Sequence, residues 1–171
     1  VKLNSVLMRG VNDDELEVFI AFVRAHDLSL RFIEVMRTND NSAFFERHHT
    51  PGAAVAAKLK AMGWLPMLRP SGAGPAIDYA QPNAPGRIGI IAPYGKDFCA
   101  TCNRLRVSAK GKFHLCLFGE HGIDLRPLLQ ADSQLDALVA RIAKLTGTKP
   151  FAHHLHDGIS GGTPHLASIG G

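Results

Sequence analysis

The chain has 171 residues, of which 46% are hydrophobic and 20% charged, the composition of a globular protein with enough apolar material for a core. No apolar run is long enough to span a bilayer, so we expect no membrane partner. The net charge of +4 and the pI of about 9.2 suit an anionic ligand or nucleic acid, but they are also typical of a protein with a small basic excess. Three cysteines cannot all pair within one chain, which favours a reducing compartment, the cytoplasm, and a metal-binding or catalytic use of the thiols.

Residues 1–36 predict a strand, a helix and a second strand. The first run, 1–8, begins in what reads as mid-strand, so we expect the chain to be a piece of a longer protein. Asn12 can cap a helix, and Glu15 three residues later completes a capping box; apolar residues then recur at helical spacing up to about residue 26. The second strand is expected over 28–36. A βα unit of this size has parallel strands.

The rest of the chain predicts shorter elements. The polar stretch 38–50 predicts an irregular segment, and a helix follows over 51–62, capped by Thr50 and ended by Gly63. Further strands are expected over 64–69, 77–81, 87–92, 104–108 and 112–117, the last two as a hairpin, and further helices over 125–130 and 133–145. From residue 146 onward apolar periodicity stops, which predicts an extended or mobile tail. This order of elements predicts an α/β fold.

Three cysteines form the most specific pattern in the sequence. Cys99 and Cys102 make a CxxC pair, and Cys116 follows on the returning strand of the expected hairpin. Thiolates in such an arrangement favour zinc, copper(I) or an iron–sulfur cluster. Structural zinc needs a fourth ligand, which His114 or His121 could supply, whereas a [4Fe-4S] cluster on three cysteines keeps one iron open for a substrate atom. From the residues alone, zinc, an iron–sulfur cluster and free buried cysteines all stay open.

Four basic residues are candidates for binding an anion. Arg104 and Arg106 follow the CxxC with one residue between them, so on a strand both guanidinium groups project to one side, where they suit phosphate or carboxylate oxygens. Lys2 and Arg31 lie on the two parallel strands of the βα unit. The plain alternatives are a solvated strand face and an ordinary ion pair. Met36 ends the second strand and by itself reads as a core residue.

These residues together resemble a known family. The segment 95–107 with its Cys-Ala-Thr-Cys-Asn-Arg-Leu-Arg core, the later Cys116 and the terminal Ile-Gly-Gly resemble the C-terminal half of the GTP 3′,8-cyclase family, the radical S-adenosylmethionine (SAM) enzymes of molybdenum cofactor synthesis. Segments 1–13 and 31–36 are also similar to family strands. The family's CxxxCxxC motif, which binds the SAM-cleaving cluster, is not found in the 171 residues. The resemblance implies βα units of an incomplete radical SAM-type (β/α) barrel over 1–70, a cluster-binding extension over 71–146 and a flexible tail over 147–171.

The resemblance also implies roles for single residues. Cys99, Cys102 and Cys116 are expected to hold a [4Fe-4S] cluster whose open iron touches the guanine of GTP. The substrate pocket would be lined by Arg104, Leu105 and Arg106, with Lys2 and Arg31 at the triphosphate and Met36 packed on SAM. The terminal Gly170 and Gly171 would enter the active site and, with Arg104 and Arg106, take part in catalysis.

In the intact enzyme, the resemblance implies that a 5′-deoxyadenosyl radical takes a hydrogen from the GTP ribose and that C3′ then joins C8, giving (8S)-3′,8-cyclo-7,8-dihydroguanosine 5′-triphosphate. Because the SAM-cluster motif is missing, we expect this chain by itself to be inactive as a lyase but to bind the substrate-side cluster and GTP. A half barrel exposes strand edges, which favours a homodimer; no nucleic-acid partner is expected. The alternatives are a zinc-stabilised module that binds nucleic acid or protein, and a metal-free fragment with reduced cysteines.

Overall fold

The fold is that of a computed structural model, which describes residues 1–95, 98–100, 102–119, 121–162 and 166–169. The chain divides into two compact units: Val1–Met36 with Ala43–Cys102, and Arg37–Ser42 with Asn103–Gly171. Each unit has its own sheet and its own apolar core. The division into three segments predicted from the sequence stays a prediction.

The first unit is built on a mixed five-stranded sheet of order β1-β2-β5-β4-β3. Its parallel part consists of β1 (Lys2–Leu7), β2 (Ser29–Glu34) and β5 (Arg87–Ile91), and its antiparallel part adds β4 (Ile77–Ala80) and the short β3 (Leu65–Pro66). The parallel pairing of β1 with β2 confirms the predicted βα unit. The strand expected over 64–69 is shorter than predicted.

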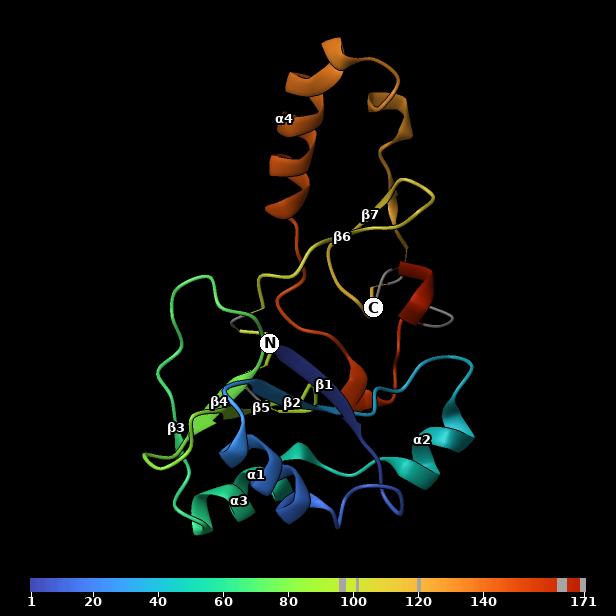
Figure 1. Ribbon diagram of the computed structural model, residues 1–171. Coiled ribbons are helices and arrows are strands. Elements are labelled where there is room, and N and C mark those ends of the chain that lie inside the picture. The colour runs from blue at the N-terminus through green and yellow to red at the C-terminus, as the bar shows by residue number, and fades with distance from the viewer. Residues whose placement is uncertain (96–97, 101, 120, 163–165, 170–171) are drawn as a thin grey trace. The chain divides into compact units, whose positions relative to one another are not determined.

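Helices α1 (Leu16–Ala25) and α3 (Gly52–Ala61) cover one face of this sheet, as Figure 1 shows. Their apolar stripes meet the strand side chains that point the same way, so that Ile20 and Leu59 pack with Phe32 and Ile88 in one core. Trp64, which follows α3, is fully buried in the same core. Burial of these side chains is the main force that holds the helices on the sheet.

Two predicted helix caps are wrong. The side chain of Asn12 serves the turn after β1 instead, because its Oδ1 accepts from the Met8 N–H at 2.8 Å and its Nδ2 donates to the Val6 carbonyl at 2.9 Å. The residue at the N-cap position of α3 is Pro51 and not Thr50. The buried Glu34 accepts from the Gly52 N–H at 2.8 Å, so a carboxylate from β2 satisfies the first turn of this helix.

The segment 38–50 was predicted to be irregular, but it contains α2 (Ser42–His48). Aromatic pairs four residues apart stabilise this helix: Phe44 packs on His48 with the rings tilted, and Phe45 stacks on His49, with ring centroids 4.8 and 4.5 Å apart. The two phenylalanines alone do not make a recognisable apolar period, which is why the pattern was not visible in the sequence.

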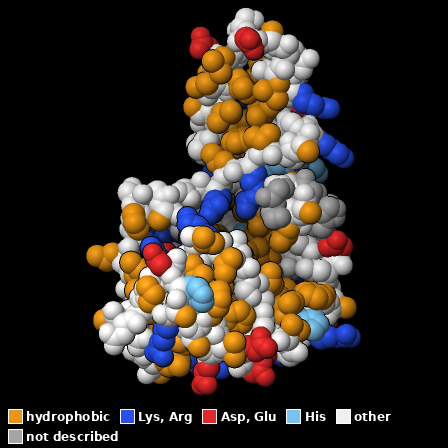
Figure 2. Space-filling view, in the orientation of Figure 1, with side chains coloured by type: hydrophobic (Ala, Val, Ile, Leu, Met, Phe, Trp, Pro, Cys, Tyr) orange, Lys and Arg blue, Asp and Glu red, His pale blue; other side chains and the backbone are white. Residues whose placement is uncertain are grey.

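The second unit has an antiparallel sheet of order β6-β7-β8, made of Arg106–Val107, Lys112–His114 and Ile123–Asp124. The predicted hairpin is confirmed, though its strands are shorter than expected. Helix α4 (Leu135–Thr146) lies beside this sheet (Figure 1) and packs Leu138, Ile142 and Leu145 against Phe113 and Leu125. Figure 2 shows further hydrophobic side chains gathered over α4, where Leu135 and Val139 are exposed.

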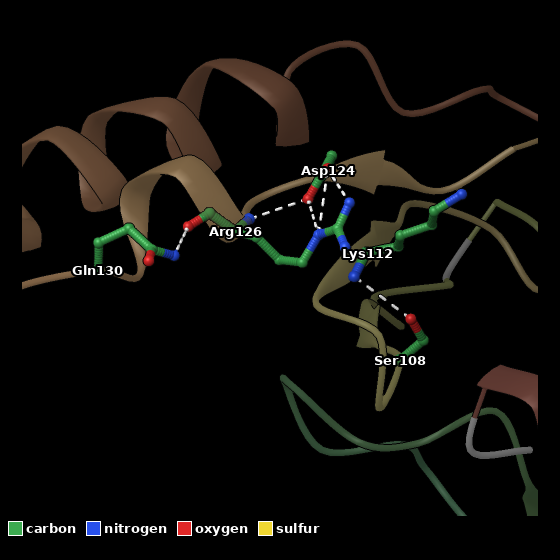
Figure 3. A network of polar contacts seen from close by, with 5 residues as sticks. All are labelled: Ser108, Lys112, Asp124, Arg126 and Gln130. Atoms are coloured by element: carbon green, nitrogen blue, oxygen red, sulfur yellow. Dashed lines mark hydrogen bonds and ion pairs between the residues drawn. The ribbon is translucent and has the colours of Figure 1, made fainter.

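A polar network closes the end of this sheet (Figure 3). The Arg126 guanidinium donates to both carboxylate oxygens of Asp124, with Nη2 2.6 Å from Oδ2, and the Gln130 amide donates to the Arg126 carbonyl. The Ser108 hydroxyl accepts from the Lys112 N–H across the hairpin turn. The hydrogen bonds from Arg126 lower the pKa of Asp124 to about 2, so this carboxylate stays charged in the folded protein well below its usual range.

The described part of the tail is not wholly extended, and its flexibility stays a prediction. It contains short 3₁₀ turns at Leu155–Asp157 and Leu166–Ile169, and the side chains of His153, Leu155, Ser160 and Ile169 are buried. None of the described helices is long and apolar enough to cross a membrane. The predicted α/β class is confirmed as a mixed sheet with helices.

Candidate functional site

The face of the first sheet opposite to α1 and α3 carries a row of polar positions. The strand register places Asn4 of β1 beside Arg31 of β2, Arg31 beside Gly89 of β5, and Gly89 beside Asp78 of β4. Because side chains alternate along a strand, the core residues Leu30 and Phe32 point to the helices and Arg31 points the other way. This face is therefore free of the helices and available to a ligand.

A cavity of about 620 Å³ opens where Arg31 and Lys2 meet. Its walls carry the cations Lys2, Arg31, Arg69 and Arg87 and the carboxylates of Asp27 and Asp78, so positive charge is in excess. The Nε of Arg31 is buried without a hydrogen-bond partner among the described residues. A buried guanidinium N–H that is not satisfied by protein is costly unless a ligand accepts from it. The cavity thus fits an anion.

Gly89 lies between Arg31 and Asp78 in the strand register. A Cβ added at this glycine would lie 2.5 Å from Asp78 Oδ1 and 3.0 Å from Arg31 Cγ. Any larger residue would therefore push one of the two charged side chains aside. The Oδ1 of Asp78 is itself buried without a described hydrogen-bond partner.

Cys99 and Cys102 lie on one tight turn at the end of the first unit. The Cys102 N–H donates to the Cys99 carbonyl at 3.0 Å, which is the i to i+3 bond of a turn. Neither cysteine forms a disulfide, and both are half-buried. The turn brings two soft ligands into one short segment, as the CxxC pattern predicted.

Cys116 belongs to the second unit and follows β7 directly. Its carbonyl accepts from the Gly119 N–H at 3.3 Å, and the residue is half-buried and forms no disulfide. Burial, and then the charges of Lys112 and Arg106, lower the pKa of His114, so this imidazole is neutral at pH 7. The Nε2 of His114 is buried without a hydrogen-bond partner among the described residues, and a Cβ added at Gly122 would lie 2.5 Å from it.

The two arginines after the CxxC differ in their surroundings. Arg106 begins β6 and is half-buried, whereas Arg104 and Leu105 precede the strand and are exposed. The predicted strand over 104–108 was therefore too long at its start. The Lys149 ammonium donates to the Arg104 carbonyl at 2.6 Å and to the Leu115 carbonyl at 2.7 Å. Lys149 was not predicted as a site residue, because it belongs to no recognisable sequence motif.

The remaining predicted site residues are Met36 and the terminal glycines. Met36 lies two residues beyond the end of β2 and is half-buried. Gly170 and Gly171 lie outside the described residues. Arg69 and Asp78 line the cavity but were missed, because only the folded sheet brings a loop and an antiparallel strand next to Arg31.

The donor set can be tested for its fit to an iron–sulfur cluster. Within each unit, the described residues contain no group of three or more His, Cys, Asp or Glu side chains that could hold a metal ion. Cys99 and Cys102 come from one unit and Cys116 from the other, and all three are unoxidised, half-buried thiols. Three soft, half-exposed thiol donors fit a cluster that needs thiolate ligands and keeps one iron open.

Comparison with known proteins identifies the family. The family described as Molybdenum Cofactor Synthesis C matches residues 28–155. The chain belongs to this family. The matched range contains Arg31, all three cysteines and Lys149, so the Molybdenum Cofactor Synthesis C region includes most of the candidate site.

Curated relatives extend the similarity to the whole chain. All 171 residues align with GTP 3′,8-cyclases: 56% are identical to that of Stenotrophomonas maltophilia, 53% to that of Vibrio cholerae and 51% to that of Aeromonas hydrophila. The alignments cover 52%, 51% and 50% of those relatives, so the chain spans about half of their length. The resemblance found in the sequence, to a C-terminal portion of GTP 3′,8-cyclase, is confirmed.

Proposed function

We propose that this chain is the substrate-side half of a GTP 3′,8-cyclase of molybdenum cofactor synthesis. In this proposal Cys99, Cys102 and Cys116 hold a [4Fe-4S] cluster, and basic residues of the chain bind the nucleotide. Arg104, Leu105 and Arg106 line the pocket at the purine end, and Lys2 and Arg31 bind the triphosphate.

The observation that carries the proposal is the cationic cavity of the first unit. Lys2 and Arg31 line the same space, although 29 positions separate them in sequence, and the buried Nε of Arg31 has no hydrogen-bond partner among the described residues. Guanidinium groups bind phosphate oxygens through parallel hydrogen bonds. A triphosphate carries enough negative charge to satisfy Arg31, Lys2 and the neighbouring Arg69 together.

The three cysteines also support the proposal. When bound, a cluster on three cysteines supplies an iron with one open position, to which a donor atom of the substrate can bind. The residues of this chain then orient the nucleotide: the cations hold the phosphates and the arginines beside the cysteines hold the other end. Positioning of this kind lowers the entropy cost of bringing the reacting carbons together.

Other parts of the reaction belong to the intact enzyme. We propose that Met36 packs on SAM, that Gly170 and Gly171 reach the substrate, and that the sheet of the first unit forms part of an incomplete (β/α) barrel of the radical SAM type. The chain by itself is expected to bind but not to turn over GTP, because its sequence does not contain a CxxxCxxC motif for the SAM-cleaving cluster.

We further propose that the protein is cytoplasmic and forms a homodimer. Cysteines that form no disulfide and an oxygen-sensitive cluster fit the reducing cytoplasm. β1 is an edge strand of the described sheet, with Val1 and Val6 exposed, and such an edge favours pairing with another chain, as in a homodimer.

The test is metal analysis after anaerobic reconstitution with iron and sulfide. The proposal predicts about four iron and four sulfide per chain, and a loss of the cluster in Cys99→Ser and Cys116→Ser. A matched control is Ser108→Ala, which changes a hydroxyl of the same hairpin without touching a thiol. Stoichiometric zinc in aerobic protein, with no iron taken up under reducing conditions, would instead support the zinc-stabilised module.

A further inference from the structure

Lys149 connects two segments that carry candidate site residues. Its ammonium donates to the carbonyl of Arg104 at 2.6 Å and to the carbonyl of Leu115 at 2.7 Å. Arg104 is one of the two arginines after the CxxC, and Leu115 is bonded directly to Cys116. One side chain thus contacts the backbone on both sides of the β6–β7 hairpin.

The Lys149 contact lies just beyond the end of the ladder between β6 and β7. The ladder between β6 and β7 pairs Arg106 with His114 and Val107 with Phe113, and neither strand extends beyond this on the side of Arg104 and Leu115. The paired part of the two strands ends there, and Lys149 contacts the segment that precedes β6 and the segment that follows β7. The ammonium takes the place of a further ladder bond, and a charged donor makes it stronger than a neutral one.

The position of Lys149 is fixed by the end of α4. Leu145 is buried in the core of the second unit, and Thr148 donates to the Leu145 carbonyl with its N–H at 2.9 Å and with its hydroxyl at 2.7 Å. The Gly147 N–H donates to the Ala143 carbonyl, which continues the helical turn. The side chain therefore starts from an ordered turn and loses less conformational entropy in reaching the two carbonyls.

We propose that Lys149 is a positioning residue that holds the Arg104 segment and the Cys116 segment together at the open end of the hairpin. We call the two hydrogen bonds from Lys149 to the Arg104 and Leu115 carbonyls the clamp. The clamp rests on the geometry, whereas the role assigned to the two segments rests on the proposed function. Because Lys149 holds both segments, the backbones that carry Arg104 and Cys116 stay at a constant distance before any cluster binds. The second unit then presents the Cys116 thiol and the Arg104 guanidinium already positioned relative to each other.

The test compares three variants of the chain. Lys149→Met keeps the aliphatic stem but removes the donor, Lys149→Arg restores donors, and Lys144→Met removes an exposed ammonium from the last turn of α4 as a control. Hydrogen exchange of the metal-free chain is followed by mass spectrometry in peptides that cover 103–107 and 112–117. Retention of iron against a chelator is then measured in the reconstituted proteins.

Lys149→Met is expected to speed exchange in these two peptides at least about tenfold, because charge-assisted hydrogen bonds are lost, while the peptides of α4 and β1 keep their rates. Lys149→Arg and Lys144→Met are expected to match the parent, and Lys149→Met is expected to lose iron several-fold faster. Unchanged exchange in Lys149→Met would overturn the clamp, and so would faster exchange in every peptide, which is global destabilisation. If the parent itself takes up no iron, the proposed function fails, and the exchange rates still decide the clamp.

Discussion

Replacing Arg31 tests the role of the cationic cavity most sharply. Arg31→Met keeps a side chain of similar length and removes the guanidinium whose Nε is buried without a described protein partner. Because no described hydrogen bond of Nε is lost in the free protein, the fold should tolerate the change. The affinity for a triphosphate should fall instead.

The expected size of the effect follows from the loss of a charged hydrogen-bond donor. A hydrogen bond to a charged group contributes about 1.5–3 kcal/mol, which corresponds to roughly a 10- to 150-fold change in Kd. The cavity is open to solvent and Lys2, Arg69 and Arg87 remain, so we expect the lower end, about tenfold for GTP. Guanosine, which has no phosphate, should bind both proteins equally.

The assay is isothermal titration of the reconstituted chain with GTP and with guanosine, at two salt concentrations. Arg24→Met is the matched control, because the Arg24 guanidinium donates to the Gln81 side chain at 2.8 Å and does not line the cavity. Arg31→Lys should recover part of the affinity. The reasoning is refuted if Arg31→Met and Arg24→Met bind GTP alike, or if guanosine binding falls as much as GTP binding.

Three further predictions concern stability. Gly161→Ala should destabilise the second unit by at least about 1 kcal/mol, measured by urea unfolding, because the glycine has φ +70° and an added Cβ would collide with the Phe118 carbonyl; unchanged stability would contradict this packing. Gly89→Ala should cost about 1–3 kcal/mol by overpacking the space between Asp78 and Arg31, visible as a lower melting temperature, and an unaltered melting temperature would speak against the close approach. The Asp124 carboxyl should titrate near pH 2 by NMR and move back toward 3.8 in Arg126→Met; since its folded pKa is depressed, its stabilising contribution is present above pH 3.8 and is lost as pH falls through about 2. An unshifted Asp124 resonance in the parent protein would contradict the ion pair.

Local patterns predicted the elements of the first unit well. Each of β1, α1 and β2 can be predicted from a pattern of a few residues: an extended run, a 3.6-residue apolar spacing and an apolar run. The parallel pairing of the two strands follows from the order of these elements. The two caps failed for a physical reason: Asn12 and Thr50 are good capping residues, but Asn12 binds the turn before it and Glu34 reaches α3 from another strand. Contacts between distant segments decide such competitions.

Some residues of the candidate site could likewise be predicted from local sequence patterns, and others could not. The CxxC turn and the pair Lys2 and Arg31 could be found from the sequence, because the cysteine spacing and the strand order are local signals and the family resemblance supported them. Asp78 and Lys149 could not be found, since their roles depend on distances set by folding: Asp78 lies across Gly89 from Arg31, and Lys149 reaches two carbonyls 34 and 45 positions away.

The central proposal is that this chain binds a [4Fe-4S] cluster whose open iron contacts the guanine of GTP. The measurement that tests it most directly is the electron paramagnetic resonance spectrum of the anaerobically reconstituted, reduced chain, recorded without nucleotide, with GTP and with ATP. The account predicts a [4Fe-4S] signal that changes when GTP is added and does not change with ATP. A cluster signal that is the same in all three samples, or a protein that takes up no iron, would contradict it.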